Sequence, residues 1–230
     1  MADNIHNSLF MILLTLAAFI LSLYLYKKTK LSILHPLLPS VLLIIAVLSI
    51  CDIDYDTYSN GVFIIDFMLG PSVVALGLGL YEQRHHIKQS WLSMLVAITV
   101  GSIAGVVSVA GIALLMNPSL ELTMTLFPKS VTSPIAIDIS RELGGIPSLS
   151  AVIVIAVGIF GGLVGPFVLR ALGITSRIAK GLALGTSSHG VGTAVAIEMG
   201  AVEGAISGLA IGLMGLATAI VAPLVKWILF

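Results

Sequence analysis

Seven apolar stretches, each long enough to cross a lipid bilayer as a helix, follow one another along this chain and leave little sequence between them. They are residues 8–26, 31–50, 62–81, 91–116, 148–169, 181–199 and 204–228. Only 10% of the residues are charged, whereas soluble domains carry roughly 25%. The sequence therefore predicts an all-α polytopic membrane protein with about seven transmembrane helices, in which residues 1–230 form a single integral membrane domain.

Two of these stretches contain residues that do not suit a continuous membrane helix. The third includes "FMLGPSVVALGLG" (67–79), where Gly70-Pro71 disturbs the helix because proline lacks a backbone donor and clashes with the preceding turn. The sixth includes "GTSSHGVGTA" (185–194), a run of Gly, Ser and Thr around His189. We expect both helices to be discontinuous.

The segment 120–141, between the fourth and fifth stretches, is too polar for a helix that faces lipid. Pro118 and Pro147 flank it, and Pro128 and Pro134 interrupt it. We expect a re-entrant or broken segment here, in addition to the seven crossings.

Charge placement bears on this topology, because cytoplasmic loops collect Lys and Arg. With the N-terminus outside and 120–141 re-entrant from the outer side, nine of the eleven basic residues fall inside, and so does the C-terminus. The nine are Lys27, Lys28, Lys30, Arg84, Lys88, Arg170, Arg177, Lys180 and Lys226. A full crossing by 120–141 would instead move Arg170, Arg177 and Lys180 outside.

The two interrupted stretches occupy matching places in the two halves of the chain, approximately 1–115 and 116–230. Shifting the chain by half its length superimposes Leu69, Gly70, Ser72 and Gly77 on Leu184, Gly185, Ser187 and Gly192. In the predicted topology the halves run in opposite directions, so they form an inverted repeat. Paired interrupted segments of this kind indicate the binding site of a transporter.

Broken helices at membrane depth must be buried in protein or line a cavity, because unpaired backbone groups are costly in hydrocarbon. The N-terminus of a half-helix offers free N–H groups and partial positive charge to an anion, and Ser and Thr add hydroxyls. The candidate binding residues are Gly70, Pro71, Ser72, Lys129, Ser130, Thr132, Ser133, Gly185, Thr186, Ser187, Ser188, His189 and Gly190. The alternative is that the small residues only let membrane helices pack closely.

Four ionisable residues are candidates for supplying charge or coupling. His189 could bind a carboxylate or take up a coupled proton, or it could be a neutral histidine bonded to a neighbouring carbonyl. Lys129 could be a fixed cation for a carboxylate, or its ammonium could extend to the membrane surface. Asp66 and Asp138 could couple cations or protons, or they could lie at the interface and the outer surface.

The sequence lacks the motifs of several functional classes. There is no GxxxxGK[ST] motif for a nucleotide, no metal-ligand spacing of Cys and His, and no basic patch with interleaved aromatics for nucleic acid. Ser187, Ser188 and His189 are neighbours, but no orienting acid is assigned to complete a catalytic triad. We expect neither an enzyme nor a metal or cofactor, and no nucleic-acid partner.

Four stretches of the chain resemble the LrgB/CidB family, and the resemblance covers essentially the full length. They are "FMLGPSVVALGLGLYEQ" (67–83), "LFPKSVTSPIAIDIS" (126–140), "GGIPSLSAV" (144–152) and "KGLALGTSSHGVGTAVAIEMGAVEGAISGLA" (180–210). The resemblance implies a bacterial inner-membrane protein with a small LrgA-like membrane partner. More loosely, it implies a fold like that of cation/proton antiporters and bile-acid symporters.

The resemblance leaves two functions open. Some members of the family take up pyruvate, and relatives include the LrgB-like half of the plastid glycolate/glycerate translocator, which implies a carrier of small monocarboxylates working by alternating access. Others are described as antiholin-like or holin-like proteins linked to murein hydrolase regulation and programmed cell death, which implies a regulator of lysis acting by oligomerisation. Gly-rich helix faces are compatible with a homo-oligomer in either case.

Overall fold

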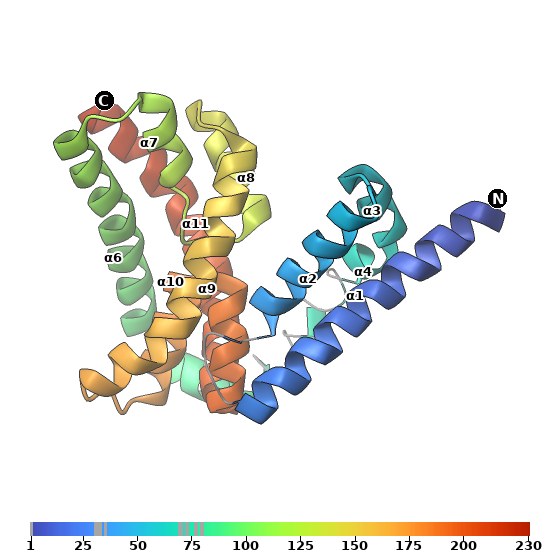
Figure 1. Ribbon diagram of the computed structural model, residues 1–230. Coiled ribbons are helices and arrows are strands. Elements are labelled where there is room, and N and C mark those ends of the chain that lie inside the picture. The colour runs from blue at the N-terminus through green and yellow to red at the C-terminus, as the bar shows by residue number, and fades with distance from the viewer. Residues whose placement is uncertain are drawn as a thin grey trace. The chain divides into compact units, whose positions relative to one another are not determined.

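The computed structural model describes residues 2–29, 34, 36–68, 71, 74, 75, 78 and 81–230. All the regular elements in these ranges are helices, and the chain divides into two compact units, Met1–Ala75 and Leu76–Phe230 (Figure 1). Four helical segments are long and apolar enough to cross a membrane: Ser8–Thr29, Ile87–Met116, Pro147–Ala171 and Ala201–Leu229. The protein is therefore an all-helical membrane protein, as the composition predicts.

The first unit contains α1 (Ala2–Thr29), α2 (Leu37–Ile50), α3 (Tyr55–Gly61) and α4 (Phe63–Phe67). Helix α1 packs against α2 and α3. A Cβ added at Gly61 would lie 2.7 Å from Cγ of Met11, so the missing side chain lets α3 approach α1 closely. The hydroxyls of Thr15 and Tyr58 are 2.9 Å apart across the same contact.

Helix α2 does not have the length that the predicted second span requires. Its 14 residues rise only about 21 Å, whereas the hydrocarbon core of a bilayer is about 30 Å thick. Of the third predicted span, 62–81, a large part lies outside the described residues. Leu69, Gly70, Ser72 and Gly77 belong to that part, so the inverted repeat between the halves of the chain stays a prediction.

Six helices of the second unit lie wholly within the described ranges. They are α6 (Arg84–Met116), α7 (Leu120–Leu126), α8 (Ser133–Leu143), α9 (Pro147–Ala171), α10 (Arg177–Met199) and α11 (Ala201–Leu229). Helix α11 packs against α6, α8 and α10, and α10 also packs against α9 (Figure 1).

Helices α7 and α8 form a hairpin that enters and leaves at one end of this unit. Their 7 and 11 residues rise about 10 and 16 Å, too little for either to cross a bilayer. Ile135 at the start of α8 lies opposite Gly215 near the middle of α11, and the Lys226 ammonium near the end of α11 donates to the Leu143 carbonyl at 2.8 Å. Helix α8 thus runs parallel to the second half of α11, and the turn 127–132 lies halfway along it.

Helix α10 reverses direction at His189, where φ is 41° and ψ is −127°. In the limb before this residue, added Cβ atoms at Gly181 and Gly185 would lie 2.5 Å from the carbonyls of Glu203 and Ser207, so this limb runs parallel to α11.

The limb after His189 runs the other way along α11. The Thr193 hydroxyl is 2.7 Å from that of Ser207, and an added Cβ at Gly204 would lie 2.7 Å from a side-chain carbon of Ile197. Along this second limb, residue numbers of α10 decrease in the direction in which those of α11 increase, so the limb is antiparallel to α11. Two limbs lying antiparallel to each other against the same helix make α10 a hairpin with its tip at His189.

This hairpin corrects two sequence-based expectations. The stretch 181–199 is not a crossing helix, because its two limbs return to the same end of the unit. Lys226 therefore lies at the opposite end from Arg177, whereas the charge count placed both on the cytoplasmic side. The C-terminus therefore lies at the end of the unit opposite Arg177, and the side of the membrane that each end faces stays a prediction.

Chemical labelling of introduced cysteines tests this geometry. In a Cys51→Ser background, we expect cysteines at Thr175 and Ala201, which flank α10 and are both exposed, to react with an impermeant maleimide from the same side of the membrane. A crossing helix would place them on opposite sides. Labelling of the two sites from different sides would refute the hairpin.

Candidate functional site

The tips of the two hairpins lie at the same level of the second unit. Val131, in the turn between α7 and α8, belongs to the same buried cluster as Ala210 and Met214 of α11. Gly185, one turn before the tip of α10, contacts Ala210 as well. Both tips therefore reach the middle of α11 from opposite ends. Half-way points of long membrane helices lie near the bilayer centre, so this level is where a substrate would be held.

Lys129 occupies the tip of the α7–α8 hairpin and has no acidic partner among the described residues. Its ammonium donates to the Ser130 hydroxyl at 3.1 Å, and the residue is partly buried. Within the described ranges the structure has one salt bridge, between Arg141 and Asp138 at 2.8 Å. A partly buried cation at membrane depth is costly unless an anion pairs with it. Lys129 is therefore the strongest candidate contact for an anionic ligand.

The hydroxyls that follow Lys129 in the chain donate to no acceptor in the part of the chain that the structure describes. Ser130 accepts from the ammonium, so its own proton is unused, and the half-buried Thr132 and Ser133 form no side-chain hydrogen bonds among the described residues. Thr132 precedes the first turn of α8 and does not cap it with its side chain. The N–H groups of that turn therefore lack a side-chain acceptor. Ser130, Thr132 and Ser133 thus lie in the turn and at the start of α8, and their role in binding stays a prediction.

The hydroxyls at the tip of α10 are already engaged. Thr186 donates to the Leu182 carbonyl at 2.8 Å, and Ser187 donates to the Ala183 carbonyl at 2.7 Å. Ser188 lies 2.9 Å from the Ser187 oxygen, and since the Ser187 proton is used, Ser188 is the donor of this pair. Thr186, Ser187 and Ser188 can thus accept a hydrogen bond from a ligand but have no free proton for a carboxylate.

His189 is buried, and its Nε2 lies 2.8 Å from the Val154 carbonyl of α9. A carbonyl oxygen only accepts, so Nε2 carries the hydrogen. This is the arrangement of a histidine bonded to a neighbouring carbonyl, which the sequence left open beside a role in substrate binding or proton coupling. The position of His189 at the tip leaves Nδ1 as the nitrogen for any further contact.

The two predicted glycines of this tip have different surroundings. An added Cβ at Gly185 would meet Ser207 and Ala210 of α11, so the missing side chain lets α10 pack closely on α11. Gly190 is exposed, and an added Cβ there would meet nothing within 4 Å. The second limb of α10 therefore begins beside open space, with the N–H groups of its first turn at the tip.

The structure does not test whether the other predicted residues of the first half belong to this site. Gly70 and Ser72 lie outside the described residues, and Pro71 is exposed in the first unit. Asp66 is exposed in α4, and Asp138 is exposed and paired with Arg141. A role of either carboxylate in ion or proton coupling stays a prediction.

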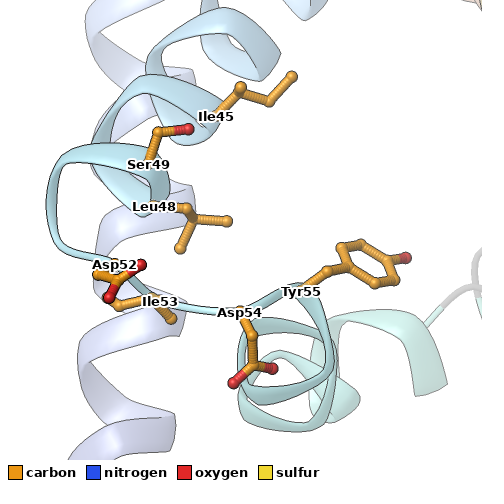
Figure 2. A pocket seen from close by; sticks show the side chains of 7 residues that line it. All are labelled: Ile45, Leu48, Ser49, Asp52, Ile53, Asp54 and Tyr55. Atoms are coloured by element: carbon orange, nitrogen blue, oxygen red, sulfur yellow. The ribbon is translucent and has the colours of Figure 1, made fainter.

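A hollow of about 330 Å³ lies in the first unit, where the end of α2 meets the start of α3 (Figure 2). It is lined by Ile45, Leu48, Ser49, Asp52, Ile53, Asp54 and Tyr55. Hydrogen bonds from the backbone and hydroxyl of Thr57 occupy both Asp54 oxygens and hold the pKa of this carboxyl below its usual range. Asp54 is thus the cap of α3. In the described ranges no three His, Cys, Asp or Glu side chains could share a metal ion.

Sequence reasoning missed the face of α9 on which the α10 tip lies. Gly158, Gly161, Gly162 and Gly165 of α9 contact residues on both limbs of α10. Their spacing of three and four residues places them on one side of a helix. This spacing in "GIFGGLVG" was a readable signal for a close helix contact.

Comparisons with known proteins agree over nearly the whole chain. The model of the LrgB-like family matches residues 15–228. An uncharacterised protein of Haemophilus influenzae is 38% identical over 92% of each chain. The antiholin-like protein LrgB of Bacillus subtilis is 37% identical over 93% of each chain, and the uncharacterised protein YxaC of the same organism is 36% identical over 96% of each. No solved structure matches.

Proposed function

Since this chain belongs to the LrgB-like family, we propose that it is a non-enzymatic carrier of small monocarboxylates, of the pyruvate, glycolate and glycerate class. In this proposal the protein lies in the bacterial cytoplasmic membrane and works with a small LrgA-like partner. The carboxylate binds between the tips of the α7–α8 and α10 hairpins.

The observation that carries this proposal is Lys129, a partly buried residue level with the middle of α11 whose ammonium has no acidic partner among the described residues. The Ser130 hydroxyl accepts from this ammonium at 3.1 Å, and Thr132, Ser133 and the first turn of α8 follow directly in the chain. A single cation with several neutral donors suits a single carboxylate. The engaged hydroxyls of α10 accept rather than donate, so they suit a hydroxyl or ammonium hydrogen of a ligand, not its carboxylate.

The two opposed hairpins give the proposed site a route to each side of the membrane. The α7–α8 hairpin enters from the end of the unit that holds Lys226, and α10 enters from the end that holds Arg177. Alternating access then requires one hairpin to open while the other stays closed. We assign the Arg177 end to the cytoplasm, because Arg84, Arg170 and Lys180 share it. The C-terminus is then outside, and with the N-terminus also outside the chain crosses an even number of times.

Uptake of radiolabelled pyruvate and glycolate into proteoliposomes tests the proposed function. The protein is reconstituted alone and together with its LrgA-like partner. We expect saturable uptake of one acid that unlabelled acid competes away, in at least one of the two preparations. Absence of saturable uptake in both preparations would refute the carrier.

A second function, regulation of murein hydrolase activity and lysis by oligomerisation, is favoured by the name "antiholin-like" that the similar Bacillus proteins carry. Helix α6 adds a compatible feature: added Cβ atoms at Gly101 and Gly105 would meet nothing within 4 Å. Glycines four residues apart on an open face suit helix association in membranes. Release of large dyes from the same proteoliposomes, without saturable acid uptake, would support this function over the carrier.

A further inference from the structure

The tip of α10 lies in a shallow seat made by glycines of α9. An added Cβ at Gly158 would overlap the His189 ring, and one at Gly161 would overlap the Ser188 hydroxyl. Farther from the tip, an added Cβ at Gly165 would lie 2.7 Å from a methyl carbon of Leu184. The absence of side chains on α9 is therefore what lets α10 sit this close.

A single described polar contact holds the tip in this seat. It is the 2.8 Å hydrogen bond from Nε2 of His189 to the Val154 carbonyl. His189 adopts a positive φ of 41°, a region that residues other than glycine rarely occupy. Strained backbone of this kind persists only where surrounding contacts hold it. The hydrogen bond and the glycine seat are the contacts that do so here.

The contact between α9 and the first limb of α10 is incompletely filled. A groove of about 250 Å³ runs between them, lined mainly by apolar side chains, with Ser187 from the tip among its residues. Its lining includes Phe160, Val164 and Leu184. Along this groove the first limb has few packing contacts with α9, because atoms beside a void have no partners there, whereas farther from the tip Leu184 and Leu169 of α9 share a buried cluster. By contrast, its contact with α11 is close at Gly181 and Gly185.

We propose that His189 is a positioning residue that latches the α10 hairpin onto α9, and that α10 is the gate opening the site toward the Arg177 end. Breaking the bond to Val154 frees the tip to lift from the glycine seat. The identity of what passes the gate rests on the proposed function. The latch itself is a property of the empty protein and is measured without substrate.

Alkylation of a cysteine at position 188 tests the latch. Ser188 is fully buried against α9, so Ser188→Cys in a Cys51→Ser background reacts with a maleimide only when the tip lifts. Adding His189→Ala should speed this reaction about five- to tenfold, as expected from the loss of one hydrogen bond. Gly158→Ala, which displaces the ring from its seat, should do the same. Gly212→Ala should leave the rate unchanged, because an added Cβ there meets nothing within 4 Å.

A restoring variant separates the hydrogen bond from general disruption. His189→Gln keeps an N–H donor on a flexible side chain and should return the alkylation rate toward that of the parent. Equal rates in the parent, His189→Ala and Gly158→Ala proteins would overturn the latch, and so would fast alkylation of the parent itself. If the variants behave as expected but no acid is taken up into proteoliposomes, the latch stands and the proposed substrate is wrong.

Discussion

Lys129→Met should lower the initial rate of monocarboxylate uptake at low substrate concentration by about tenfold or more. Hydrogen bonds to charged groups contribute about 1.5–3 kcal/mol, and about 1.4 kcal/mol corresponds to tenfold in affinity. Methionine keeps much of the length and apolar body of the side chain, so the substitution removes charge with little change in packing. Initial rates in proteoliposomes across a range of substrate concentrations measure the effect, which we expect mainly as a rise in KM.

The matched control is Lys88→Met near the start of α6, where the lysine is exposed. Uptake should be close to that of the unchanged protein, because an exposed ammonium in water gains little from any partner. If Lys129→Met transports as well as Lys88→Met, then Lys129 only extends to the membrane surface, and the anion is held elsewhere.

Much of this architecture can be predicted from local sequence. Long apolar stretches predict the helices α1, α6, α9 and α11, because a bilayer requires about 20 apolar residues per crossing. Proline and polar residues in 120–141 predict a broken segment, and the structure breaks it at 127–132. The decapeptide 185–194 predicts a discontinuous helix, and the structure interrupts α10 at His189.

The reversal of α10 could not be predicted in the same way. An interrupted crossing helix and a hairpin share the same composition and length, and both place Gly, Ser and Thr at the break. The two differ in whether the ends of α10 lie at the same end of the unit or at opposite ends. Contacts between α10 and α11 decide this, namely Gly181 with Glu203 and Gly204 with Ile197. The distribution of Lys and Arg did not distinguish the two, because it was satisfied by placing Lys226 and Arg177 on the same side. In the structure they lie at opposite ends of the unit.

The roles of the hydroxyls were also beyond the sequence. The sequence does not distinguish the Ser and Thr residues of the two tips. In the structure Thr186 and Ser187 donate to carbonyls of their own helix, whereas the Thr132 side chain forms no hydrogen bond with the backbone of α8. A Ser or Thr within a helix can donate to the carbonyl four residues earlier, whereas one that precedes a first turn has no carbonyl there to use. Helix boundaries within a few residues of the tip therefore decide which hydroxyls are available.

Gly192→Val should destabilise the protein more than any other glycine substitution in α10. An added Cβ at Gly192 would overlap the Leu184 carbonyl and lie 2.8 Å from Cβ of Ser188, both on the opposing limb. Overpacking of a core typically costs about 1–3 kcal/mol. Here the opposing atoms include backbone, which cannot turn away as a side chain can. We expect the Tm of the detergent-solubilised protein to fall by at least about 5 °C.

Gly208→Val in α11 is the matched control, because the same substitution in a helix meets nothing within 4 Å there. The comparison bears on the hairpin itself. In a continuous helix residues 184 and 192 are about 12 Å apart, so valine at position 192 would not reach the Leu184 carbonyl. Equal Tm values for Gly192→Val and Gly208→Val would therefore contradict the close approach of the two limbs, and with it the gate that opens between α10 and α9.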